Sequence, residues 1–166
     1  MRKLLSLGAL TLALSSPALG WADIFDPPPA LQGQKSSRIF AVSGVMTARG
    51  LGTLFSCTNL AQSPAILSVE LYASGGSASC NDASAVAVSV APGASVRFVT
   101  QNSPDSSFAD GVPLQTPPQY MDNGSASILS TSKSVICSVA VFDSANSPPT
   151  SMMRLEVFAK GKQKGG

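Results

Sequence analysis

Short runs in which apolar and polar residues alternate, each ended by glycine or proline, constrain most strongly how this chain can fold. Residues 85–99, AVAVSVAPGASVRFV, show the pattern clearly. Alternation with a period of two is typical of half-buried strands, and Pro92 followed by Gly93 favours a tight turn. The stretch therefore predicts a β-hairpin with an apolar face made of Val86, Val88, Val90, Val96 and Phe98.

Arg97 has the opposite parity from these apolar residues, so we expect it to face water. A slip of one residue along the strand would bury its charge, and Arg97 therefore helps to fix the register. Its position predicts a solvated strand face rather than a binding site.

The rest of the chain repeats this pattern and shows no credible helix. Charged residues make up only 12% of the sequence, too few to coat amphipathic helices. Besides the two arms of the hairpin, strand patterns cover residues 38–47, 51–59, 65–73, 125–131, 134–142 and 151–159. About eight short strands without interleaved helices predict an all-β fold, an antiparallel two-sheet sandwich.

The pattern at 65–73 predicts a strand with one buried face. Leu67, Val69 and Leu71 share one parity, and Ser68 and Glu70 share the other. We expect the leucines and the valine to face the core and the two polar residues to face water.

The chain divides into four parts. Residues 1–22 have the charged start, the short apolar run and the small residues of a secretory signal peptide, cleaved after Gly20 or Ala22. Residues 23–37 form an extended, proline-rich arm, residues 38–159 the sandwich and residues 160–166 a basic tail. Without the leader nine basic residues face nine acidic ones, a balance that argues against nucleic acid as a partner.

Three cysteines entering an oxidising compartment predict one disulfide. Cys57 and Cys137 lie on apolar strand faces, as a bridge that ties two sheets through the core requires, whereas Cys80 lies in a loop rich in glycine and serine. We expect the pair Cys57–Cys137, with Cys57–Cys80 as the main alternative.

The connection from 101 to 124 is unusually long and holds four prolines. Loops of this length in a compact domain are usually functional or mobile. Its large apolar side chains either pin a crossover between the sheets onto the core or form a loop that binds a partner. These side chains are Phe108, Leu114, Tyr120 and Met121.

The chemistry of common catalytic sites is missing. The chain has no histidine, which removes the Ser-His-Asp and Cys-His arrangements and the histidine-bearing zinc sites. Glu70 and Glu156, the only glutamates, are each expected on a solvated strand face. The aspartates of the long loop match no calcium-binding spacing. The sequence therefore predicts no enzyme, no cofactor and no metal site.

Several stretches together carry a resemblance: SCTN, VSVAPGASVRFVT, SASILSTSKSVICSV and DSANSPPT. With them, most of residues 38–158 resembles small exported bacterial β-sandwich proteins of immunoglobulin-like fold that have no assigned activity. The resemblance implies this fold and an exported, periplasmic or extracellular location. It brings no catalytic or binding residues with it.

These observations predict an exported, non-enzymatic structural or protein-interaction module of the bacterial envelope or extracellular space. Its partner is an unidentified protein or glycan, its oligomeric state is open, and no segment after residue 22 is apolar enough to span a membrane. Two alternatives remain. The arm at 23–38 could add a strand to a neighbour in a surface filament. Tyr72, Tyr120 or Phe108 could provide a stacking platform for a carbohydrate.

Overall fold

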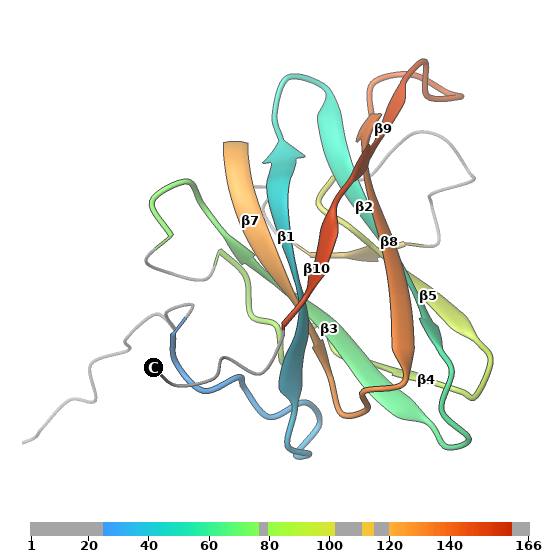
Figure 1. Cartoon of the computed structure of the whole chain (residues 1–166). Coiled ribbons are helices and arrows are strands. Elements are labelled where there is room, and N and C mark those ends of the chain that lie inside the picture. Colours follow the sequence, from blue (N-terminus) through green and yellow to red (C-terminus); the bar gives the residue numbers. More distant parts are fainter. Residues whose placement is uncertain (1–24, 77–79, 102–110, 115–119, 161–166) are drawn as a thin grey trace, which may run out of the picture.

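The structure is a computed structural model that describes residues 25–76, 80–101, 111–114 and 120–160 (Figure 1). The described residues form ten strands and no helix. The strands are β1 (Ser37–Thr47), β2 (Leu51–Asn59), β3 (Ala65–Tyr72), β4 (Val88–Val90), β5 (Ser95–Val99), β6 (Val112–Pro113), β7 (Met121–Ser130), β8 (Val135–Asp143), β9 (Met152–Leu155) and β10 (Val157–Ala159). The leader at 1–22 lies outside the described residues, as does the tail beyond Lys160.

The strands make two sheets of five. The first sheet has the order β10-β1-β7-β3-β4, and the second sheet has the order β6-β5-β2-β8-β9. One apolar core lies between them, with contributions from both, including Val69 and Ile128 of the first sheet and Phe55 and Phe98 of the second. The all-β, two-sheet prediction is confirmed, and the sheets do not close into a barrel.

All strand pairs are antiparallel except the short pair β5–β6, which is parallel. The strand β6 lies within the stretch expected to be a loop, and β7 begins at Met121, earlier than the expected residue 125. The count of ten strands rather than about eight comes from β6 and from a division of the last predicted strand.

Residues 85–99 do not form the predicted hairpin. β4 joins the first sheet beside β3, whereas β5 joins the second sheet beside β2. Pro92 and Gly93 therefore carry the chain from one sheet to the other, with Gly93 at a φ of +73°. The buried Asn59 fixes this crossing, because its side chain donates to the Val90 carbonyl (3.0 Å) and its backbone carbonyl accepts from Gly93 (2.8 Å).

The predicted strand at 151–159 divides in a similar way. β9 pairs with β8 in the second sheet, and β10 pairs with β1 in the first sheet. The chain changes sheet at Glu156, and in Figure 1 β9 runs on into β10 with little change of direction.

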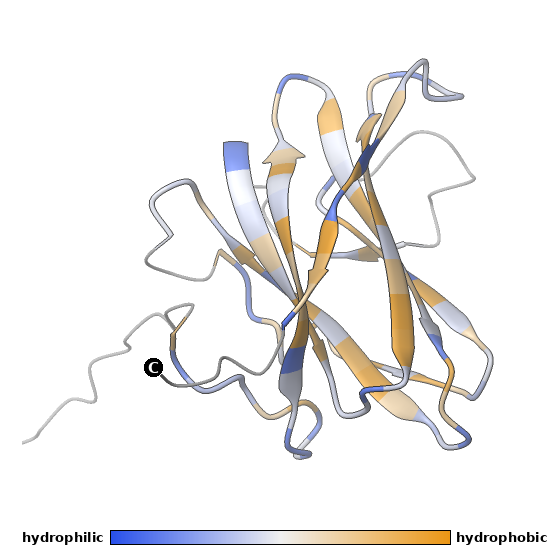
Figure 2. Ribbon diagram, viewed as in Figure 1, coloured by the Kyte–Doolittle hydropathy of each residue, from blue (hydrophilic) through white to orange (hydrophobic). Residues whose placement is uncertain are grey.

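β3 is buried on both faces, so the predicted solvated face is wrong. Ser68 and Glu70, expected in water, are no more than 1% exposed. The arm from residue 25 and the loop at 80–87 cover this outer face, where Leu31 is completely buried in a small apolar cluster with Ile66 and Leu129. Apolar and polar residues nevertheless alternate along most strands (Figure 2).

Candidate functional site

The structure pairs Cys57 with Cys137 in a disulfide, the pairing favoured from the sequence. The two residues are direct neighbours on β2 and β8, with their Cα atoms 4.2 Å apart. Both strands belong to the second sheet, so the expectation that the bridge ties the two sheets together is wrong. Alternation placed each cysteine on a core face correctly, but it cannot tell which sheet holds each strand.

Cys80 remains unpaired and packs against the core. Burial raises the pKa of its thiol, while a hydrogen bond to the backbone of Ala73 lowers it by less. Because the thiolate is the reactive form, the raised pKa favours an inert thiol.

The four side chains of the predicted interaction loop have different places. Leu114 and Met121 are buried in the core, which fits the interpretation that they pin the connection. Tyr120 is 64% exposed, and its hydroxyl accepts a hydrogen bond from Arg49 Nε at 3.1 Å. Phe108 lies outside the described residues. Tyr72 is completely buried, so it cannot supply the exposed ring that a carbohydrate platform needs.

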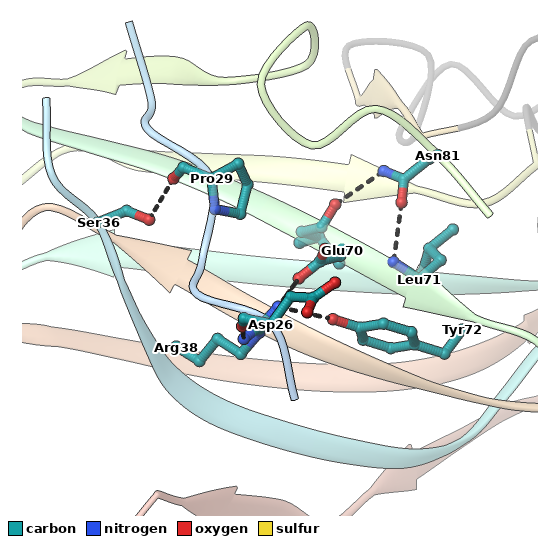
Figure 3. Close-up of polar contacts among 9 residues, drawn as sticks. Asp26, Pro29, Ser36, Arg38, Glu70, Leu71, Tyr72 and Asn81 are labelled. Carbon is teal, nitrogen blue, oxygen red and sulfur yellow. Dashed lines mark hydrogen bonds and ion pairs between the residues drawn. The ribbon is translucent and has the colours of Figure 1, made fainter. Parts of the chain in front are cut away.

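A buried polar cluster that the sequence did not reveal lies under the arm (Figure 3). Arg38 on β1 donates to Glu70 Oε2 on β3 from both Nε (3.2 Å) and Nη2 (3.0 Å). Nη2 also donates to the Tyr72 hydroxyl at 3.2 Å, and Nη1 donates to the backbone carbonyl of Asp26 in the arm. The side chains of Arg38 and Glu70 are only 6% and 2% exposed.

The electrostatics of this cluster favour a fixed ion pair. Burial lowers the pKa of Arg38, but the hydrogen bonds and the charge of Glu70 outweigh it and leave the pKa raised. Burial, and then Glu70, raise the pKa of Tyr72, so its phenol stays neutral. The arginine is charged, the tyrosine is neutral, and the side chains of Arg38, Glu70 and Tyr72 are all buried. The cluster can therefore hold the arm against the first sheet. It offers no exposed acid or base to a substrate.

The outer faces of the two sheets differ. On the first sheet the arm and the loop at 80–87 cover the face over β3, whereas many outward side chains of β2, β5, β8 and β9 in the second sheet are at least partly exposed. Val99 and Phe142, which share this outward parity, are buried. We call the partly exposed surface the open face. Its residues are Leu54, Ser56, Thr58, Ser95, Arg97, Ile136, Ser138, Ala140, Met152 and Arg154. Arg97 is exposed, as its parity predicted.

The open face is hollowed beside β9. A depression of about 370 Å³ lies between Leu54, Ser138 and Arg154. A larger cleft of about 730 Å³ follows the crossing from β9 to β10, lined by Phe40, Ile136, Cys137 and residues 154–158. Arg154 borders both hollows. Large apolar side chains that line these hollows are exposed, namely Ile136 (56%), Met152 (55%) and Phe158 (53%).

A second polar cluster fixes the loop between β8 and β9. The Asp143 carboxylate accepts hydrogen bonds from the Thr150 hydroxyl, the Asn146 amide and the backbone N–H of Ala145. These bonds, led by that of Thr150, lower the pKa of Asp143 to about 2. The arrangement positions β9, the strand that borders both hollows.

Across the described residues, no three His, Cys, Asp or Glu side chains gather where they could hold a metal ion. The same part of the chain contains no helix with the length and apolar character needed to cross a bilayer. Comparison of the chain with protein-family models, with curated proteins and with solved structures finds no match.

Proposed function

We propose that the protein is an exported, non-enzymatic module of the bacterial envelope or extracellular space that binds a partner protein through the open face. The contrast between the two sheets carries this proposal. The arm and the loop at 80–87 cover the outer face of the first sheet over β3, whereas the outer face of the second sheet around Ser56, Ser138 and Arg154 is at least partly exposed. Exposed apolar side chains grouped on one face are typical of an interaction surface.

The side chains of the open face define the chemistry of this partner. Arg97 and Arg154 are its charged residues, and the described residues of this face include no carboxylate. Hydroxyl groups and small apolar side chains lie between them. The surface therefore favours a protein whose contact region presents a carboxylate to Arg154 and apolar side chains to the hollow beside Met152.

The signal-peptide pattern supports export, and the disulfide is compatible with an oxidising compartment. We further propose an immunoglobulin-like sandwich. The runs β1-β7-β3 and β2-β8-β9 match the runs B-E-D and C-F-G of that fold. Two features depart from it: β4, β5 and β6 follow the D-like strand, and β10, from the end of the chain, occupies the place of strand A.

The two alternatives have less support. A filament subunit that donates its arm would have to release Leu31 and the Asp26 carbonyl from their contacts within the same chain. A carbohydrate module retains Tyr120 as its one described exposed ring among the three that were expected, and that ring is bonded to Arg49.

Site-specific photo-crosslinking in the cells that produce the protein tests the proposed function. A photoreactive residue at Ser138, on the open face, should crosslink to one partner, and Arg154→Glu, beside it in the same hollow, should abolish the crosslink. The matched control is the same residue at Ser134, which is exposed in the turn before β8. Equal crosslinking from both positions, or none from Ser138, contradicts the proposal. Mass spectrometry of the N-terminus tests export, with cleavage expected after Gly20 or Ala22.

A further inference from the structure

Strand β8 has β9 beside it along only part of its length. β9 pairs with β8 from Phe142 to Val139 and then leaves for the first sheet, where β10 pairs with β1. Residues 135–138, the first part of β8, therefore have β2 on one side and, among the described residues, no strand on the other. In Figure 1 the lower parts of β8 and β10 diverge from the crossing. The larger cleft follows this crossing.

The backbone of Cys137 points to the uncovered side of β8. Cys57 and Cys137 are opposed with their Cα atoms 4.2 Å apart, the short spacing of an antiparallel pair that exchanges no backbone hydrogen bonds. The N–H and the carbonyl of Cys137 therefore point away from β2. Asp143, which has the same parity on β8, likewise points away from β2 and donates its N–H to the Ser151 carbonyl, just before β9.

The opposite wall of the cleft is also a strand edge. Among the residues that the structure describes, β10 has β1 as its one strand neighbour. The Lys160 N–H donates to the Ile39 carbonyl on β1, so alternation directs the N–H and the carbonyl of Val157 away from β1. Val157 and Cys137 both line the cleft. The cleft is therefore bounded on two sides by strands with backbone groups that no neighbouring strand pairs.

Two facing strand edges restrict what can fill the cleft. A folded sheet brings its edge strand together with a second strand beside it, and β10 occupies the place that this second strand needs. The same restriction applies to a second copy of this chain. A single extended segment has no such neighbour and can add to the edge of β8 alone, as in recognition by β-strand addition. The geometry therefore favours one isolated strand as the occupant.

The lining of the cleft selects an apolar segment. Phe40, Ile136 and Phe158 contribute large apolar side chains, and those of Ile136 and Phe158 are more than half exposed. Arg154 and Glu156 also line the cleft, and their opposite charges favour neither sign of charge in the segment. The last six residues of the chain, GKQKGG, contain no apolar side chain, so they do not suit this lining.

We propose that the cleft binds a single extended segment of another protein, which adds a strand to β8 beside Cys137. The segment is a terminus or a linker with apolar residues at alternate positions, because every second side chain of a strand points to the same side. It continues the ladder that β9 leaves. The uncovered part of β8 accommodates about four residues, roughly 13 Å at the usual rise of a strand. This site is separate from the contact at Ser138 on the open face.

Hydrogen exchange of the purified protein, followed by NMR, tests the uncovered edge. In the free protein the Cys137 amide should exchange about tenfold or more faster than the Val139 amide, which lies in the ladder with β9. Equal protection of the two amides would mean that a segment of the chain itself, or a second copy, already covers the edge. That result would overturn the proposal, and its dependence on protein concentration would show which of the two is present.

A phage library of random linear dodecapeptides is the probe for the occupant. Panning against the purified protein should enrich peptides with apolar residues at alternate positions. A synthetic peptide of an enriched sequence should then slow exchange of the Cys137 amide about tenfold or more and leave that of the Val139 amide unchanged. Enrichment of no such peptide, or binding that leaves the Cys137 amide unprotected, contradicts the proposal.

A pair of matched variants locates the bound peptide. Phe158→Ser removes an exposed side chain of the cleft and should weaken binding of the peptide about tenfold or more. Met153→Ser is the control, because Met153 is 60% exposed but does not line the cleft, and it should change the affinity less than about twofold. Equal effects of the two variants would refute the proposed position.

The exchange measurements use the wild type, so they decide the matter even if a variant fails to fold. They also separate this inference from the proposed function. Absence of the Ser138 crosslink, together with a peptide that protects the Cys137 amide, would contradict the proposed function and leave this inference standing. A Ser138 crosslink without any peptide that protects Cys137 would do the reverse.

Discussion

Glu70→Gln should destabilise the protein strongly, although it changes a single atom type. Glu70 is the counter-ion of a guanidinium that is itself 6% exposed. Removing one partner of a buried ion pair typically costs about 3–5 kcal/mol, because it leaves a buried charge uncompensated. Arg38 would still donate to the Tyr72 hydroxyl and to the Asp26 carbonyl, so we expect a value near the lower limit.

Thermal and urea unfolding followed by circular dichroism measure this cost. A loss of about 3 kcal/mol corresponds to a fall in Tm of about 10 °C for a domain of this size. Arginine does not release its proton in proteins. The cost therefore cannot be relieved by titration of Arg38, and we expect it to be similar across about pH 5 to 9.

Two control variants separate the buried charge from other effects. Glu156→Gln makes the same change at an exposed position and should alter the stability by less than about 0.5 kcal/mol. The double variant Arg38→Met with Glu70→Leu removes both charges and should recover most of the loss, because apolar residues often replace buried ion pairs without penalty. A loss below about 1 kcal/mol for Glu70→Gln would refute the reasoning.

Four further variants probe other contacts. Replacing Cys57 and Cys137 together by alanine should lower the stability to thermal unfolding by up to about 4 kcal/mol, given the 80-residue separation, whereas Cys80→Ala should leave the bridge intact in non-reducing peptide maps. The hydrogen bonds of Asp143 lower its folded pKa to about 2, so the stability that they add is complete above its unfolded pKa of about 3.9 and is lost as the pH falls towards 2. The deficit in Tm of Asp143→Asn should therefore be largest near neutral pH and shrink between about pH 4 and 2. Leu31→Ala should cost about 2 kcal/mol, because its apolar cluster is small, and limited proteolysis should then cut the arm sooner.

The sequence predicted the strands better than their partners. Alternation identified the apolar faces around Val90 and Phe98 because it depends on the local backbone alone. It could not show that Pro92 and Gly93 connect two different sheets, since a hairpin and a crossing have the same local composition. The division at Glu156 was missed for the same reason, because residues on both sides of it keep the strand pattern.

The buried cluster of Arg38, Glu70 and Tyr72 was not predicted from the sequence, for a different reason. Glu70 alternates with Leu71 and Val69, which is the pattern of a solvated residue. Its burial depends on the arm and on Arg38, which lies 32 residues earlier in the chain. A single sequence carries no signal for such a pair. The disulfide was easier to predict, because three cysteines allow few pairings and two of them lie on apolar faces.

The buried cluster bears on the filament alternative that the sequence left open. A subunit that donates its arm must first free it from its own sheet, where Arg38 holds the Asp26 carbonyl and Leu31 packs with Ile66 and Leu129. Release of the arm would also uncover the ion pair between Arg38 and Glu70, whose side chains are almost fully buried. Donation therefore costs free energy before any contact with a neighbour forms, and the contacts within the chain favour an arm that stays on its own sheet.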